Sequence, residues 1–402
     1  MLIWWLKMKK NLTIHYSLLH FFYQVVSICI VGYSSYYLLG CGFKNTEIGI
    51  IVAVSNIIAV ILLPMIGSFA DKPTSPSLKN IMLILYVIFL AGTASLFILN
   101  GRVMWLTCIV FGICSMMFQI LMPLLNSLGT ESLNQGQNIS IGAARGTGSL
   151  AYAIVSYILG IVVIPLGITV VPVFASVALI IIIIGLYLFP FNKNKKDNSL
   201  QGNDIVKISV LDFFKKYPSF TLVLIGCICF YINHTLLNNF LYQIVSSKNG
   251  TTAQMGTATA IAAILELPIM FGFHYLLKKV SAGKWILICG VFYTIKALGS
   301  LLVPNMLGFY FVQVFQMFSW AVIAVATVYY VNSVMEKEDT IKGQSYMGMT
   351  FTIGTILGSV LGGVLLDYTS VNMMLIAATI VSMIGIIFVY KGIAKKENSC
   401  SN

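Results

Sequence analysis

Long apolar runs, separated by short polar segments, occupy most of the chain. Each run holds about twenty residues or more with few charges, enough for a helix that rises 1.5 Å per residue to cross about 30 Å of hydrocarbon. The pattern predicts an all-α membrane protein with twelve spanning helices, over residues 12–39, 47–69, 80–99, 103–126, 139–164, 168–190, 218–245, 253–277, 285–303, 307–333, 343–366 and 371–391.

One polar, lysine-rich segment interrupts this pattern near the middle of the chain. Residues 191–217 separate six apolar runs from six others, and part of the segment (205–216) could form a short helix on the membrane surface. We therefore expect an N-terminal six-helix bundle over residues 1–190, a cytoplasmic central loop over 191–217, and a C-terminal bundle with a cytoplasmic tail over 218–402.

The two halves also share short patterns at a nearly constant distance. Gly49 before the second run and Gly256 before the eighth are 207 residues apart, and the Leu-Pro pairs that end in Pro64 and Pro268 are 204 apart. A repeat that contains six spans predicts two pseudo-symmetric bundles around a central cavity.

Composition excludes two large classes of protein. Only 9% of the side chains are charged, against about 25% in an ordinary soluble protein, and 58% are hydrophobic. A soluble enzyme of this length could not cover its surface with so few charges, and a disordered chain would need low hydrophobicity.

The net charge of +12 is explained by where the basic residues lie. With the N-terminus inside, nineteen of the 24 Lys and Arg residues fall in cytoplasmic segments and three in outer loops. This bias predicts a multi-pass protein of the cell membrane with both termini cytoplasmic. The lipid bilayer is therefore the expected partner of the basic residues, and no nucleic acid is expected.

The sequence predicts no cofactor site, either from the spacing of its cysteines or from phosphate-binding motifs. Most of the eight cysteines lie inside apolar runs, where cysteine behaves as a small hydrophobic residue, and none has a zinc spacing. No Gly-rich phosphate loop is present, so ATP is not expected to power the protein directly. We expect no metal and no cofactor.

The loop after the second run carries Gly67-x-x-x-Asp71-Lys72. Together with twelve spans in two halves, this loop resembles the major facilitator superfamily (MFS), and the resemblance covers nearly the whole chain. It implies the MFS fold and a conformational latch formed by Gly67, Asp71 and Lys72. The rest of the family's loop signature is degraded here, because Pro73 and Pro76 follow.

Three further stretches are similar to the branch of lactose permease-like sugar symporters, nucleoside symporters and aromatic-acid permeases. They are 123–128, 144–152 and 266–271. The chain departs from the sugar symporters at several positions that the resemblance marks as functional: Asn126 replaces a carboxylate, Tyr152 a tryptophan, Lys296 an arginine, and Gln316 and Ser319 a His and a Glu. An unchanged lactose-type mechanism is therefore excluded.

Three charged side chains fall within apolar runs: Arg145, Glu266 and Lys296. Each costs about 2.5–3.5 kcal/mol to insert, so such groups usually face water or a partner. Glu266 is the candidate for proton coupling, with Lys296 as the neighbouring cation. The alternative is a structural Glu266–Lys296 pair between the eighth and ninth spans.

Arg145 shares a helical stripe with Gly148, Ser149 and Tyr152. A guanidinium with an aromatic ring two turns away can clamp a hydroxylated or anionic solute. The alternative is that Arg145 extends to the cytoplasmic surface from its position near the helix end.

Uncharged polar side chains recur on several spans and predict a polar cavity for a neutral solute. The candidate solute ligands, besides Arg145 and Tyr152, are Gln24, Gln119, Asn126, Asn238, Gln313, Gln316 and Trp320. His20 and His234 lie on spans that are repeat partners, and each could move protons or bond a neighbouring helix.

These features favour a secondary active transporter. The expected activity is proton symport of a small polar organic solute (a sugar, an oligosaccharide or a nucleoside) into the cell, by alternating access of a monomer. A proton-antiport exporter of amphipathic compounds, and an uncoupled channel or receptor on the same fold, are the alternatives. An intramembrane enzyme is not expected, because no span carries a catalytic constellation.

Overall fold

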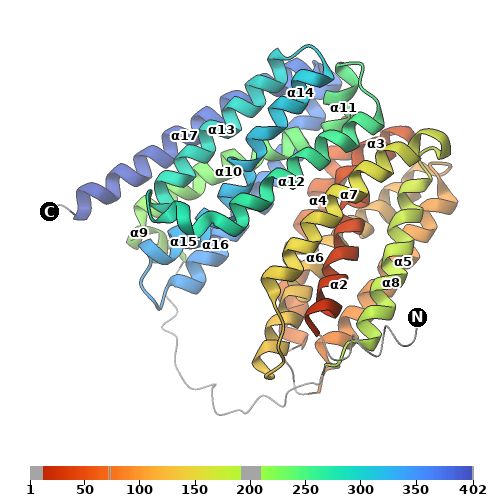
Figure 1. Cartoon of the computed structure of the whole chain (residues 1–402), viewed down its shortest axis with the longest axis horizontal. Helices are drawn as coiled ribbons and strands as arrows, with labels where there is room; N and C mark the ends of the chain where they lie inside the picture. Colours follow the sequence, from red (N-terminus) through yellow and green to blue (C-terminus); the bar gives the residue numbers. More distant parts are fainter. Residues whose placement is uncertain (1–11, 71, 73, 192–209, 401–402) are drawn as a thin grey trace. The chain divides into compact units, whose positions relative to one another are not determined.

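The computed structural model describes residues 12–70, 72, 74–191 and 210–400, with side chains up to residue 394. Every regular element in these ranges is helical, and twelve segments are long and apolar enough to span a membrane (Figure 1). The predicted all-α class and the twelve spans are confirmed.

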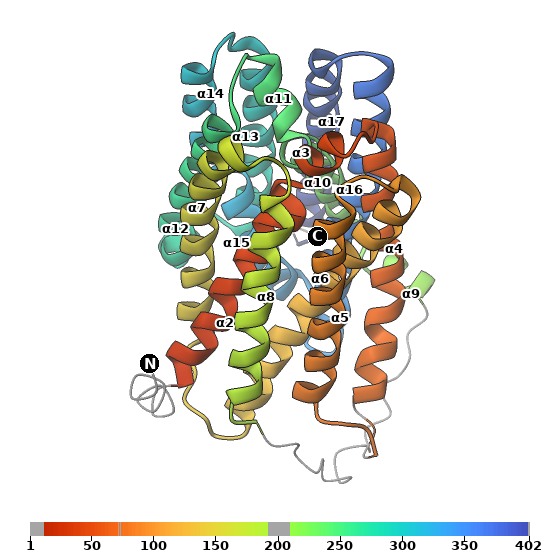
Figure 2. The ribbon, with the colours of Figure 1, turned by 90° about the vertical axis from the view of Figure 1, so that its right-hand side faces the viewer.

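The described chain forms two compact units. Residues 12–191 with Thr252–Ala260 make the first, and residues 210–251 and 261–400 the second. The first unit contains α2 (Leu12–Ser27), a π-helical turn η1 (Ile28–Gly32), α3 (Ser34–Gly40), α4 (Asn45–Ala70), α5 (Leu78–Leu99), α6 (Met104–Asn134), α7 (Ile141–Leu166) and α8 (Val170–Leu188). Within it, α2 packs on α7 and α8, and α5 packs on α6 and α8 (Figure 2).

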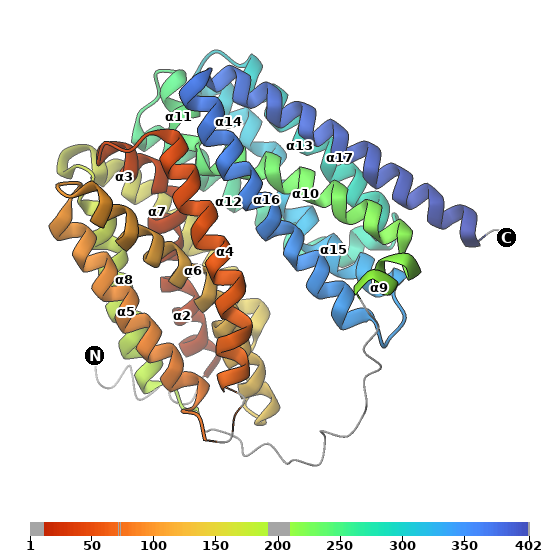
Figure 3. The same cartoon turned by 180° about the vertical axis from the view of Figure 1, so that it is seen from behind.

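The second unit has the matching helix pairs. It contains α9 (Val210–Lys216), α10 (Pro218–Asn239), α11 (Leu241–Ser247), most of α12 (Thr252–Leu277), α13 (Ala282–Leu302), α14 (Met306–Gln313), a 3₁₀ segment η3 (Val314–Met317), α15 (Trp320–Val334), α16 (Thr340–Tyr368) and α17 (Val371–Cys400). Here α10 packs on α16 and α17, and α13 packs on α15 and α17 (Figure 3).

Helix boundaries repeat between the halves. The short helix α11 begins 207 residues after α3, and α12 begins and ends 207 residues after α4. Helices α5 and α13 begin 204 residues apart, after Ser77 and Ser281, which both have extended backbone at the helix N-cap. The weak sequence echo therefore reflects a real structural repeat.

The fourth span differs from its counterpart in the second half. Helix α6 runs unbroken from Met104 to Asn134, whereas its counterpart is divided into α14, η3 and α15. Near the break, the hydroxyl of Ser319 donates to the Phe315 carbonyl at 2.9 Å, a back-bond that is typical of bent helices. The predicted span over 307–333 is present as Met306–Val334, but its helix changes to 3₁₀ geometry at η3.

Glycines on α16 let that helix approach α10 closely. A Cβ added at Gly358 would lie 2.8 Å from the Thr235 Cβ and 3.0 Å from the Ile232 carbonyl oxygen, while Gly354 faces Tyr231. Small residues at four-residue spacing allow this backbone contact in membrane helices. These glycines allow α16 and α10 to pack closely.

Candidate solute and proton site

Three candidate residues of the second unit form a continuous polar chain. The Lys296 ammonium on α13 donates to the Oε1 of Gln316 on η3, and the Gln316 Nε2 donates to the Glu266 Oε1 on α12 at 3.0 Å. Lys296 and Gln316 are only 3% and 4% exposed, and Glu266 is half-buried. The structure thus brings together an anion and a cation that the sequence places thirty residues apart, with a neutral amide between them.

A second cluster in this unit joins aromatic and polar side chains. The His234 imidazole on α10 stacks on the Trp320 indole, with 4.2 Å between ring centroids and 15° between ring planes. The Asn238 amide donates to the His234 carbonyl at 2.7 Å and lies 3.2 Å from the His234 Nδ1. The Trp320 ring also meets the rings of Tyr231 and Phe351. His234, Asn238 and Trp320 are therefore neighbours, as a common site requires.

Gln313 ends α14, directly before η3. It is 3% exposed, and its Nε2 has no hydrogen-bond partner among the described residues. A buried amide donor without a partner costs about 1–3 kcal/mol, so a polar ligand at this position would recover that energy. Gln313 is a donor of the kind that solute recognition needs.

In the first unit, candidates on α2 and α7 lie close together. Gly148 on α7 leaves room for Gln24 on α2, because a Cβ there would lie 3.0 Å from the Gln24 Cγ. His20 is 1% exposed, its ring meets the Tyr16 ring edge-on at 4.7 Å, and its Nε2 has no partner among the described residues. Gln24 and His20, one turn apart on α2, therefore both lie beside α7 at Gly148.

The candidates on α6 lie well inside a helix that is longer than predicted. Gln119 and Asn126 are both half-buried, and the Asn126 Oδ1 is buried without a hydrogen-bond partner in the described chain. Because α6 continues to Asn134, the acidic Glu131 also belongs to this helix rather than to a loop. An unpartnered acceptor on Asn126 suits a solute hydroxyl.

Arg145 is the fifth residue of α7, and its side chain is exposed. Tyr152 is half-buried, two turns further along, and its hydroxyl lies 3.2 Å from the position that a Cβ on Gly32 would take. Arg145 is within electrostatic range of Tyr16 and His20. Both roles considered for Arg145 are compatible with this position.

The expected latch is described only in part. Gly67 lies in the last turn of α4 with open space around it, and Lys72 is exposed. Asp71 lies outside the described residues. The nearby Lys79 donates to the carbonyls of Tyr187 and Phe189 at 2.8 Å each, so it caps the C-terminal end of α8.

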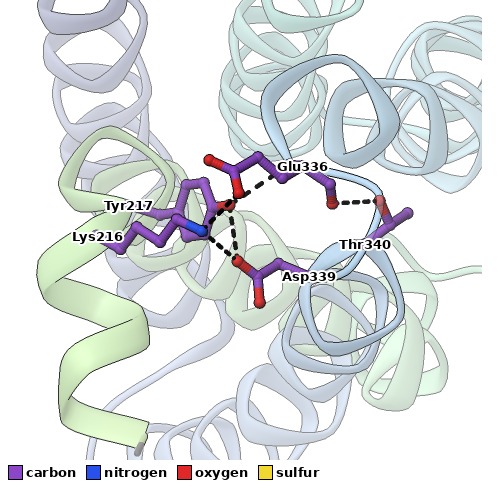
Figure 4. Close-up of polar contacts among 5 residues, drawn as sticks. All are labelled: Lys216, Tyr217, Glu336, Asp339 and Thr340. Atoms are coloured by element: carbon purple, nitrogen blue, oxygen red, sulfur yellow. Dashed lines mark hydrogen bonds and ion pairs between the residues drawn. The ribbon is translucent and has the colours of Figure 1, made fainter. Parts of the chain in front are cut away.

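An ionic cluster that sequence reasoning missed lies in the second unit (Figure 4). The Lys216 ammonium, at the end of α9, donates at 2.8 Å to both the Glu336 and the Asp339 carboxylates, and the Tyr217 hydroxyl donates to Asp339 at 2.9 Å. The hydrogen bond from Lys216 holds the pKa of Asp339 below its usual range, and the Asp339 and Glu336 carboxylates raise the pKa of Lys216. The only sequence signal was a Glu and an Asp three residues apart between two spans.

The described part of the chain shows neither a metal-binding group nor a disulfide. No group of three or more His, Cys, Asp or Glu side chains in it could hold a metal ion, and the seven cysteines whose side chains are described are free.

Comparison with known proteins identifies the family. A sequence model described as the MFS_1-like family matches residues 13–377, and no curated protein matches the chain. Among solved structures, the nucleoside transporter NupG has a TM-score of 0.77 at 16% identity, over 96% of this chain and 98% of that one; a point variant of it has 0.81 at 15% identity, over 96% and 99%.

Other solved transporters share the fold. An auto-inhibited peptide transporter of the POT family has a TM-score of 0.71 at 10% identity, covering 94% of this chain and 95% of that one. A bacterial homologue of the human lysosomal transporter Spinster has 0.62 at 14% identity, covering 95% and 94%. At these identities the structures show the fold alone. With the match of its own sequence over 13–377, the chain belongs to the MFS_1-like family and is a multi-pass membrane transporter of the major facilitator superfamily, not an enzyme.

Proposed function

We propose that this protein is a proton-coupled symporter that imports a small polar organic solute, of the sugar, oligosaccharide or nucleoside class, across the cell membrane. The transport cycle is alternating access, in which the two bundles expose a central site to one side of the membrane at a time. The protein works as a monomer with both termini in the cytoplasm, on the side that carries the basic residues.

The observation that carries this proposal is the environment of Glu266. Its carboxylate accepts a hydrogen bond from Gln316 and belongs to a polar chain that ends at Lys296. A carboxylate is expensive to place in a membrane. Gln316 and Lys296 favour the charged form of Glu266, so its carboxylate can exchange a proton with the solute site. We assign the proton to Glu266 and the compensating charge to Lys296, with His20 and His234 as groups that can assist proton movement.

The candidate solute ligands in this proposal are named for each unit by itself. The second unit supplies Asn238, Gln313 and Trp320, and the first supplies Gln24, Gln119, Asn126, Arg145 and Tyr152. Amides can bond the hydroxyls of a neutral solute, and aromatic rings can cover a sugar or base face. The likeness to a nucleoside transporter supports the nucleoside class, although the peptide transporters show that this fold alone does not set the cargo.

The test is a pH measurement with purified protein in liposomes. A panel of sugars, oligosaccharides and nucleosides is added outside lightly buffered vesicles, and the external pH is followed. Symport makes the medium alkaline for the true solute, because protons enter with it. Acidification would instead support the proton-antiport exporter, and solute entry without any pH change would support an uncoupled carrier or channel.

A further inference from the structure

The side-chain amide of Asn238 is oriented by a backbone carbonyl. Its Nδ2 donates a hydrogen bond at 2.7 Å to the carbonyl oxygen of His234, one turn earlier on α10. A carbonyl can only accept hydrogen bonds, so the nitrogen of the amide, and not its oxygen, lies on this side. The same nitrogen is 3.2 Å from the Nδ1 of the His234 ring. An amide NH2 group has two hydrogens, one for each of these two acceptors.

This contact fixes which nitrogen of the His234 ring carries a proton. Because the Asn238 Nδ2 is a donor, the His234 Nδ1 must accept, and a proton on Nδ1 would set two donors against each other. The single proton of the neutral ring is therefore on Nε2. A doubly protonated ring meets the same conflict at Nδ1, and the Lys296 ammonium, which is within electrostatic range, would repel a second positive charge.

Aromatic neighbours hold the His234 ring in this orientation. One face is covered by the Trp320 indole, which lies nearly parallel to it, and the Tyr293 ring meets it edge-on with 6.2 Å between centroids. The His234 side chain is half-buried, and no hydrogen bond among the described residues engages its Nε2. The Nε2–H group is thus a fixed donor that has no acceptor in the described chain, which is what the recognition of a polar ligand requires.

We propose that His234 is a solute-binding residue that donates a hydrogen bond from Nε2 to an oxygen or nitrogen acceptor of the solute, and that Asn238 is the positioning residue that fixes this tautomer. This inference rests on the proposed function and deepens it. It gives His234 a role in recognition, and leaves proton movement to Glu266. It also restricts Trp320, because the face that His234 covers cannot stack on a sugar or a base.

The tautomer is tested first, in the absence of solute. Full-length protein with 15N- and 13C-labelled histidine is measured in liposomes by solid-state NMR, which separates protonated from unprotonated ring nitrogens. One-bond correlations to Cγ and Cδ2 distinguish Nδ1 from Nε2, and comparison with His234→Gln assigns the signals of this ring. We expect an unprotonated Nδ1 and a protonated Nε2 at pH 7. A protonated Nδ1 would overturn the inference.

Transport assays then compare His234→Phe with His234→Gln in liposomes. Phenylalanine keeps an aromatic ring against Trp320 but removes the donor, whereas the glutamine amide can place an N–H near the position of Nε2. The probe is the member of the sugar, oligosaccharide and nucleoside panel with the largest pH response. The KM for exchange at equal pH and the accumulation driven by a pH gradient are both measured. His274→Phe, which changes an exposed histidine of α12, is the matched control.

His234→Phe should raise the KM for exchange about tenfold, the loss expected for one hydrogen bond to a polar ligand, while His234→Gln should change it less than about threefold. Both variants should keep the number of protons per solute, because Glu266 is intact, and His274→Phe should match the wild type. Asn238→Leu should raise the KM about threefold on its own and add nothing to His234→Phe, since it acts through the imidazole ring.

Two transport results would overturn the inference alone. One is a wild-type KM in His234→Phe, and the other is a loss of gradient-driven accumulation in His234→Gln with normal exchange, which would make His234 a proton carrier. An equal effect of Asn238→Leu with and without His234→Phe would overturn the positioning role of Asn238. If His234→Phe fails to fold on thermal unfolding, the NMR measurement and His234→Gln decide. No pH response to any member of the panel would overturn the proposed function, whereas the tautomer is measured independently of it.

Discussion

At the scale of single residues, the structure places Gln316 between Glu266 and Lys296. Sequence reasoning identified Glu266 and Lys296 as neighbours because both are rare intramembrane charges, but it could not place Gln316 between them. That arrangement depends on three separate segments and on a local break in a helix. Residue type therefore predicted that Glu266 and Lys296 are partners. The position of Gln316 between them could not be predicted from the sequence.

The ionic cluster of Lys216, Glu336 and Asp339 should stabilise the fold in a pH-dependent way. Because the pKa of Asp339 is lowered in the folded protein, its contribution is fully present above its ordinary value of about 4 and is lost as the pH falls through the lower folded value. We expect Asp339→Asn to cost about 1 kcal/mol at pH 7, or about 2–4 °C in Tm.

Thermal melts of Asp339→Asn and wild type between pH 7 and pH 3 measure this effect. The two curves should approach each other toward the acid end, where the wild-type carboxylate begins to take up a proton. Lys215→Ala is the matched control, since Lys215 lies next to Lys216 in an exposed pair 3.9 Å from Asp212 and should leave Tm unchanged. A gap between wild type and Asp339→Asn that is constant over the whole pH range would contradict the account.

At the scale of elements, periodicity and length predicted the helices well, but not their interruptions. The apolar runs gave all twelve spans, because a membrane leaves helices as the main choice for such segments. The break at η3 contains no proline, and Ser319 resembles any polar residue on a helix face, so no local signal reveals it. The sequence allows a short helix within 205–216, and the described residues of that range form α9 over Val210–Lys216.

The glycines of α16 provide a test of helix packing. Gly358→Ala would push a methyl group against Thr235 and the α10 backbone, and overpacking of this kind costs about 1–3 kcal/mol. Gly348, on the same helix, has nothing within 4 Å of the added carbon, so Gly348→Ala should be neutral or slightly stabilising. Melting temperatures of the two variants in detergent give the comparison. Equal values would mean that α16 and α10 do not approach as closely as described.

At the scale of the whole molecule, the distribution of basic residues predicts the orientation in the membrane. Nineteen Lys and Arg residues on the expected inner side against three outside predict a cytoplasmic C-terminus. A fluorescent protein fused after Asn402 should therefore fluoresce, and alkaline phosphatase at the same place should be inactive. Fusions at Lys248, in an expected outer loop, should behave the opposite way. Active phosphatase at the C-terminus would reverse the assigned topology.

The most direct test of the central claim is solute transport by Glu266→Gln in liposomes. This variant keeps the shape of the side chain but cannot change its charge, so a pH gradient should no longer drive solute above its external concentration. Exchange of solute at equal pH should continue near the wild-type rate, because a permanently neutral carrier can still alternate while loaded. Uphill accumulation equal to that of the wild type would show that Glu266 does not carry the proton.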